Sequence, residues 1–298
     1  MSARRIAGQA GRGHFAMLLF SALVAGSFSL GGLAANELAP TALNFVRFAI
    51  AAAVLGGVAL ATIGLPHAAF RAPWRYLVLG GLFSIYFVTM FEGLKTAPPI
   101  SSAAVFTLTP LMAAGFGFII AGQRMTLRMG VALAIGAVGA LWVIFRADWA
   151  AFMAFEIGRG EAIFFWGCIA HAAYIPMVAR LNRGEAPMVF SFGTLVAGAL
   201  LLLVYGWGDI VGADWMNLPS VVWVAVLYTA VAGSAITFVL VQYAALRLPA
   251  AKVMAYTYLV PSWVIGWEVA LGQFVPSGFV LVGVAVTMAA LLLLLKPE

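Results

Sequence analysis

The chain consists of long apolar stretches separated by short polar connections. Ten stretches of roughly 20 residues predict helices, each long enough to cross about 30 Å of hydrocarbon. Segments such as MAALLLLL and LVAGALLLLVY do not alternate apolar and polar residues, so they predict helices rather than the strands of a membrane barrel. The predicted spans cover residues 14–35, 41–64, 74–94, 97–121, 127–146, 161–180, 187–205, 219–242, 250–271 and 276–295.

The composition agrees with an integral membrane protein. Hydrophobic residues make up 64% of the chain and charged residues only 9%, whereas soluble domains carry about 25% charged residues.

The first 40 residues combine arginines, an apolar run and a small-residue LAAN segment, as a cleaved signal peptide does. The apolar run is longer than a signal core, so we interpret it as the first span. The single cysteine, Cys168, excludes a disulfide within the chain.

The distribution of charge predicts the orientation in the membrane. The formal net charge is +6, but the basic residues occur in alternating loops rather than in one patch, so nucleic acid is not an expected partner. With a cytoplasmic N-terminus, twelve of the 16 Lys and Arg residues face the cytoplasm. The positive-inside rule therefore predicts that both termini are cytoplasmic.

The fourth and ninth spans resemble each other. APPISSAAVFTLTPLMAAGFGFIIAGQ aligns with LPAAKVMAYTYLVPSWVIGWEVALGQ, which places Pro110 opposite Pro261 and ends both segments in Gly-Gln. Because each copy holds five spans, an odd number, the second copy must be inserted with inverted topology. We expect an all-α membrane domain of ten helices, with one repeat over residues 1–146 and the other over 147–298, around a central cavity.

Pro110 and Pro261 each lie near the middle of a predicted span. A mid-helix proline removes one hydrogen bond and bends the helix. Two bends at matching depth suggest a cavity between the repeats; proline tolerated by packing alone is the alternative.

The ten spans, the NFVRF segment of the second span and the two P…GQ segments together resemble the drug/metabolite transporter superfamily, in particular its EamA-type members. Within it the chain is most similar to the aromatic amino-acid exporters of the YddG type. The resemblance implies a basket of ten helices with two-fold pseudo-symmetry in the membrane plane, and export across a bacterial inner membrane. The family usually has Gly-Glu where this chain has Gly122-Gln123 and Gly272-Gln273.

The sixth span carries the most informative polar group. Ionisable residues inside a bilayer normally face a bundle interior or water, and His171 lies at the centre of this span. Trp166 and Tyr174 fall on the same side of the helix by our estimate, so all three are candidates for lining a substrate cavity. A histidine bonded to a neighbouring helix for packing is the alternative.

Two further spans carry amphipathic rings. In the ninth span Lys252, Tyr256, Trp263 and Trp267 share a narrow helical face, which suits flat or cationic ligands. Interfacial anchoring of the tryptophan and snorkelling of the lysine are the alternatives.

In the third span Tyr86 lies with Phe83, Phe87 and Met90 on one side, as an aromatic wall or as ordinary packing. Tyr228 and Gln242 in the eighth span are weaker candidates.

Three charged residues are candidates for coupling or gating. Glu92 and Glu268 lie near the outer ends of their spans, although Glu92 can instead pair with Lys95 one turn away. Arg47 lies about two turns inside the outer surface, where pairing with Glu37 or Glu92 is an alternative to substrate contact.

The motifs favour a transporter over a membrane-embedded enzyme. The chain lacks HExxH, GxSxG and paired aspartates within spans, so we expect no catalytic residue, cofactor or metal. The many tyrosines and tryptophans and the few basic residues within the spans favour export of aromatic or other apolar amino acids over phosphorylated metabolites. Other amphipathic metabolites or drugs are the second choice. We expect a monomer that works by alternating access, with small-residue helix contacts at Gly136 and Gly139.

Overall fold

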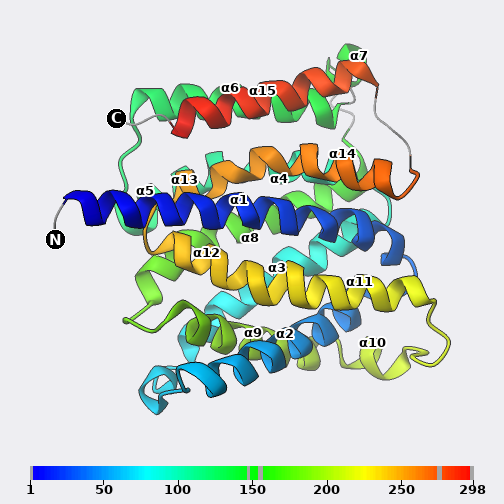
Figure 1. Cartoon of the computed structure of the whole chain (residues 1–298). Coiled ribbons are helices and arrows are strands. Elements are labelled where there is room, and N and C mark those ends of the chain that lie inside the picture. The colour runs from blue at the N-terminus through cyan, green and yellow to red at the C-terminus, as the bar shows by residue number, and fades with distance from the viewer. Residues whose placement is uncertain (1–2, 146–147, 154–156, 274–276, 296–298) are drawn as a thin grey trace.

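Helices run side by side through the whole structure, a computed structural model (Figure 1). It describes residues 3–145, 148–153, 157–273 and 277–295, and no strand occurs within these ranges. The predicted boundary between the repeats, at residues 146 and 147, lies outside the described residues. Before this boundary lie α1 (Ala3–Ala34), α2 (Pro40–Thr62), η1 (His67–Phe70), α3 (Trp74–Leu94), α4 (Pro99–Phe106), α5 (Thr109–Ala121) and α6 (Leu127–Ile144).

The second half repeats this arrangement with more interruptions. After the boundary lie α7 (Trp149–Met153), α8 (Arg159–Leu181), α9 (Pro187–Tyr205), α10 (Trp207–Gly212), α11 (Ser220–Ala230), η2 (Val231–Ile236), α12 (Thr237–Ala245), α13 (Ala250–Met254), η3 (Ala255–Leu259), α14 (Val260–Ala270) and α15 (Gly278–Leu295). Of these, η3 is a 3₁₀ helix and η2 is a π-helical turn inside the eighth span.

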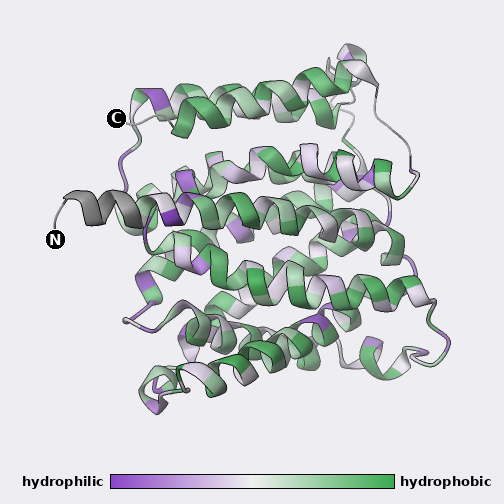
Figure 2. Ribbon diagram, in the orientation of Figure 1, coloured by the Kyte–Doolittle hydropathy of each residue, from purple (hydrophilic) through white to green (hydrophobic). Residues whose placement is uncertain are grey.

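Nine helical stretches among the described residues are long and apolar enough to cross a membrane. This confirms the all-helical membrane fold predicted from the sequence. The remaining predicted span, 250–271, is helical from Ala250 to Ala270 but is divided into α13, η3 and α14, each too short to cross a membrane alone. Hydrophobic colour covers much of the long helices in Figure 2, while hydrophilic residues concentrate near the helix ends and in the connections.

The contacts pair helices from the two halves. α6 packs on α15 at one edge of the bundle and α2 packs on α9 at the opposite edge (Figure 1). Between these edges, α3 packs along α8. The beginning of α1 and the end of α15 lie at the same end of the bundle, which we call the terminal end (Figure 1).

Glycines allow two of these pairs to approach closely. A side chain at Gly93 of α3 would lie 2.6 Å from the carbonyl oxygen of Gly160 in α8. At the α6–α15 contact, a side chain at Gly139 would lie 2.8 Å from the carbonyl oxygen of Gly283. Small residues at such positions give backbone-to-backbone packing, which is the main source of helix association where lipid surrounds the protein.

The two predicted proline bends are real breaks, and they touch each other. Pro110 is the second residue of α5, where it leaves the Phe106 carbonyl without a backbone donor; the hydroxyl of Thr109 donates to that carbonyl at 2.7 Å. Pro261 is the second residue of α14, directly after η3. The hydroxyls of Thr109 and Thr257 lie 3.4 Å apart, so the breaks of the two repeats meet inside the bundle.

Candidate substrate site

Rings from α3, α4 and α8 surround His171 inside the bundle. Its imidazole stacks on the ring of Tyr86 with 4.4 Å between centroids, and the rings of Phe83 and Phe106 lie 5.2 Å away. Tyr174, one turn further along α8, packs edge-on against Phe83 at 4.1 Å. All five side chains are buried. The structure therefore brings together three residues that the sequence singled out, His171, Tyr86 and Tyr174.

The polar groups of this cluster are only partly satisfied. Both ring nitrogens of His171 and the hydroxyl of Tyr86 are buried without a hydrogen-bond partner among the described residues. The Tyr174 hydroxyl, in contrast, accepts a hydrogen bond from Nε2 of Gln242 at 2.8 Å. An unsatisfied buried polar group costs about 1–3 kcal/mol, and such groups in a folded protein call for an explanation, of which a ligand is one.

A small cavity lies against these groups. Its volume is about 10 Å³, roughly the least that one water molecule occupies, so an amino acid does not fit and the site is closed in this structure. Its walls come from α1, α3, α8, η2 and α12, with elements of both repeats. The lining residues are Phe20, Val24, Phe83, Tyr86, Phe87, His171, Gly233, Thr237 and Phe238.

Arg47 of α2 lies behind one wall of this cavity and is fully buried. Its Nε donates to the hydroxyl of Ser234 and its Nη2 to the carbonyl oxygen of Gly233, both at 2.7 Å. Both acceptors belong to η2, and Gly233 lines the cavity. Glu37 and Glu92 are not its partners, so the acidic pairing considered from the sequence is not observed.

Trp166 does not belong to the cluster. Its side chain is 67% exposed, on the outer surface of α8, while His171 and Tyr174 on the same helix are buried. The prediction that these three residues share a cavity was wrong for Trp166. The physical reason is the helical period of 100° per residue: Trp166 and His171 are five positions apart, about 140° around the helix, which is too far for one face.

The predicted stripe of the ninth span is divided. Tyr256 is buried and its hydroxyl lies 3.1 Å from Nδ1 of His14 in α1, while Lys252, half-buried, is close enough to interact electrostatically with His14. Trp263 is 43% exposed and donates from Nε1 to Ser21 of α1 at 3.2 Å. η3 explains the division, because a 3₁₀ helix turns 120° per residue and rotates the face between Tyr256 and Trp263.

The two candidate carboxylates lie away from the cluster. Glu92 forms an ion pair with Lys95 at 2.6 Å on the partly exposed end of α3, which is the simpler interpretation of that residue. Glu268 is buried in α14, on a helix that does not line the small cavity.

Several residues of the site were not predicted from the sequence. Phe238 of α12 lies 4.1 Å from Phe83 between ring centroids, and Phe106 of α4 closes another side. Neither carries a polar group that distinguishes it from ordinary apolar positions. The small-residue segment AGSA, which contains Gly233 and Ser234 of η2, is the one signal in the sequence that marks a close approach in this span.

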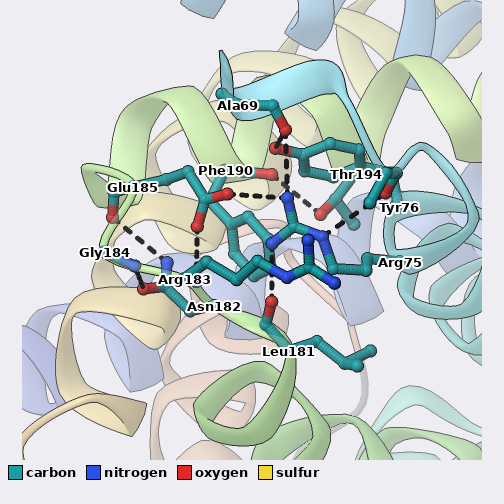
Figure 3. Close-up of polar contacts among 11 residues, drawn as sticks. Ala69, Arg75, Tyr76, Leu181, Asn182, Arg183, Gly184, Glu185, Phe190 and Thr194 are labelled. Atoms are coloured by element: carbon teal, nitrogen blue, oxygen red, sulfur yellow. Dashed lines mark hydrogen bonds and ion pairs between the residues drawn. The ribbon is translucent and has the colours of Figure 1, made fainter.

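A second polar cluster lies at the terminal end, where α3 begins and α8 ends (Figure 1); Figure 3 shows its contacts. The guanidinium of Arg75, at the start of α3, donates to the carbonyl oxygens of Leu181 at 2.6 Å and Ala69 at 3.0 Å, and to Oε1 of Glu185 at 2.7 Å. Tyr76 also donates to Ala69. Arg75 thus ties the connection before α3 to the α8–α9 connection, one from each half of the chain.

The charge of this cluster is well compensated. Burial raises the pKa of Glu185, but the hydrogen bonds from Arg75 and from the backbone amide of Arg183, together with the charge of Arg75, outweigh this effect. The net result is a pKa below the ordinary value for a glutamate, so Glu185 is ionised at neutral pH.

These observations define the class of the protein: a helical membrane transporter built from two repeats, whose halves meet at a small, partly polar cavity. The chain belongs to the EamA-like transporter family, whose model matches residues 11–145 and again residues 158–296. The double match places the family unit once in each half of the chain.

Known proteins of similar sequence are also transporters. The chain is 26% identical over 280 residues to the "Uncharacterized transporter YyaM" of Bacillus subtilis (strain 168), covering 91% of this chain and 92% of that protein. It is 34% identical over 115 residues to the "Aromatic amino acid exporter YddG" of Ancylobacter novellus, covering 38% of each chain. A solved crystal structure with a TM-score of 0.73 and 22% identity covers 97% of both chains and shows the same fold.

Proposed function

We propose that this transporter exports amino acids with aromatic or other apolar side chains. The observation that carries the proposal is the buried ring cluster around His171, where aromatic faces and unsatisfied polar groups lie between helices of both halves. Flat or apolar side chains gain stacking and burial energy there, and the polar groups fix the orientation of the substrate. The partial similarity to an aromatic amino-acid exporter supports this choice of substrate.

The proposed mechanism is alternating access. The cavity holds no more than a water molecule, so the helices that line it must separate before a substrate enters. The paired breaks next to Pro110 and Pro261 are the natural points for this movement, because helix halves on either side of a break tilt without losing a continuous row of hydrogen bonds. We place the protein in a bacterial inner membrane, as a monomer with both termini in the cytoplasm.

The test uses purified protein in lipid vesicles and labelled Phe, Trp and Met, with and without a pH gradient. Matched substitutions on one helix separate the site from the surface: His171→Ala should lower transport at least tenfold, and Trp166→Ala should leave it within about twofold of the parent protein. A carrier that moves none of the three amino acids above the rate of empty vesicles would contradict the proposal. Transport of cationic dyes without amino-acid transport would favour the alternative, an exporter of amphipathic drugs.

A further inference from the structure

Arg47 is a buried cation whose known contacts leave its charge without an acidic partner. The ion pairs among the described residues are Arg75–Glu185 and Glu92–Lys95, and neither involves Arg47. Its guanidinium lies over the ring of Phe87, with 3.6 Å from Cζ to the ring centroid. The guanidinium of arginine stays protonated inside proteins, so a full positive charge lies within the membrane-spanning bundle.

The two hydrogen bonds of Arg47 use neutral acceptors in η2. A π-helical turn follows the i→i+5 hydrogen-bonding pattern, and such turns inside α-helices frequently occur at functional sites. Here the turn presents the Gly233 carbonyl and the Ser234 hydroxyl to Nη2 and Nε. A side chain at Gly233 would meet the hydroxyl of Ser27 of α1 and would lie 3.2 Å from Nη2 of Arg47, so the absence of a side chain there helps the guanidinium to approach η2.

One nitrogen of the guanidinium is still available. Nη1 is buried and has no hydrogen-bond partner among the described residues. Two groups that contact Arg47, the ring of Phe87 and the backbone of Gly233, also form the wall of the small cavity. The guanidinium is therefore separated from the His171 cluster by a single layer of side chain and backbone.

We propose that Arg47 binds the carboxylate of the transported molecule. This inference rests on the proposed function and adds the group that the carrier recognises: a carboxylate within reach of a flat or apolar side chain, rather than an amine or a neutral amphipathic molecule. Arginine suits this role because its planar donors bind a carboxylate through two parallel hydrogen bonds. As the site opens and Phe87 moves away from the guanidinium, the carboxylate accepts a hydrogen bond from Nη1 and competes with the Gly233 carbonyl of η2 for Nη2.

The two parts of the substrate then bind to two different regions of the site. The carboxylate lies at Arg47, and the aromatic side chain lies among Phe83, Tyr86 and His171. The same binding event loosens the hydrogen bonds between α2 and η2, which links occupancy to movement of the eighth span. Substrate thus supplies the counter-charge that Arg47 does not find among the described residues.

The first experiment needs no variant. Vesicles containing the wild-type carrier take up labelled Trp in the presence of unlabelled Trp, tryptamine, which lacks the carboxylate, or tryptophanamide, in which a neutral carboxamide replaces the carboxylate. We expect the two carboxylate-free compounds to compete at least tenfold more weakly than Trp, since a charge-assisted hydrogen-bond pair is lost. Equal competition by all three compounds would overturn the inference while leaving amino-acid transport, and hence the proposed function, intact.

The second experiment assigns this preference to Arg47. For each protein we compare the concentrations of tryptamine and of unlabelled Trp that halve the uptake of labelled Trp. In Arg47→Gln the ratio of the first concentration to the second should fall about 10- to 100-fold, towards one. Arg124→Gln, on an exposed arginine, is the matched control and should keep the wild-type ratio. Arg47→Lys keeps the charge without the planar donors, so an intermediate ratio is expected.

The outcomes are distinguishable. A folded Arg47→Gln protein that transports Trp with an unchanged ratio would make Arg47 a purely structural clamp on η2 and end the inference. If Arg47→Gln does not fold, Arg47→Lys decides: an intermediate ratio supports the inference, and a folded Arg47→Lys protein with the wild-type ratio would end it. A wild-type carrier that moves no amino acid at all would instead contradict the proposed function.

Discussion

Tyr86 and Tyr174 are equally buried but differ in their hydrogen bonds. The Tyr86 hydroxyl has no hydrogen-bond partner in the described part of the chain, whereas that of Tyr174 accepts a hydrogen bond from Gln242. Tyr86→Phe should therefore leave the thermal unfolding midpoint unchanged or raise it, because it removes an unsatisfied group. Tyr174→Phe should destabilise the protein by about 1–3 kcal/mol, because it leaves the Gln242 amide without an acceptor. Thermal unfolding of both variants in detergent measures the difference.

The same pair separates a binding role from a packing role. If the Tyr86 hydroxyl contacts substrate, Tyr86→Phe weakens transport of labelled Trp or Phe while its stability is preserved. A Tyr86→Phe protein that transports normally would show that the hydroxyl takes no part in binding.

At this scale the sequence predicted which residue types form the site better than where each one points. His171, Tyr86 and Tyr174 are rare polar groups within apolar spans, and the cost of burying them in lipid makes an inward direction predictable. The side chain of Trp166 can point either into the bundle or towards the lipid, since tryptophan tolerates a membrane surface, so its direction was not predictable. The partners of Arg47 lie 186 and 187 positions away in sequence, and no local pattern encodes such a contact.

Among the elements, the interrupted helices are those for which the sequence predicted the structure best. Pro110 and Pro261 predict bends, because proline lacks the backbone donor that a continuous helix requires. The contact between the hydroxyls of Thr109 and Thr257 depends on how the repeats pack. η2 has no counterpart in the sequence pattern, because one extra residue in a helical turn leaves the apolar character of the span unchanged.

The α6–α15 pair gives a prediction at the scale of the element. Gly139→Ala should lower stability by about 1–3 kcal/mol, because the new methyl group would lie 2.8 Å from the Gly283 carbonyl oxygen and neither backbone can yield. Gly130→Ala, on the same helix, is the control: its side chain would have no neighbour within 4 Å, so the higher helix propensity of alanine should leave stability equal or greater. Thermal unfolding in detergent measures both, and equal midpoints would show that α6 and α15 are not held by backbone contact.

For the whole molecule, we expect the cluster around Arg75 to control how readily the terminal end opens during the proposed alternating access. The ion pair with Glu185 joins connections from the two halves of the chain and is almost fully buried. Alternating access requires this tie to break whenever the substrate site opens towards the terminal end. Weakening the tie should therefore increase the time that the site spends open to that side.

A cysteine in the cavity wall reports this opening. The native Cys168 is replaced by Ser, and Thr237→Cys then places the single thiol of the chain against the cavity. Adding Glu185→Gln should raise the rate of thiol labelling from the terminal side several-fold. Glu92→Gln breaks an ion pair within one helix and should leave the rate unchanged. Equal rates in all three proteins would show that Arg75 and Glu185 do not limit opening.

The pH dependence of this effect follows from the lowered pKa of Glu185. A carboxylate with a depressed pKa contributes its stabilisation above its unfolded pKa, about 4.3 for glutamate, and loses it as the pH falls through the folded value. The ratio of labelling rates, Glu185→Gln to parent, cancels the intrinsic pH dependence of the thiol. We expect this ratio to be constant between pH 7 and about 5 and to approach one below about pH 4, where the parent protein loses the ion pair as well. A ratio that already falls to one near pH 6 would mean that some other group, with a higher pKa, holds the terminal end closed.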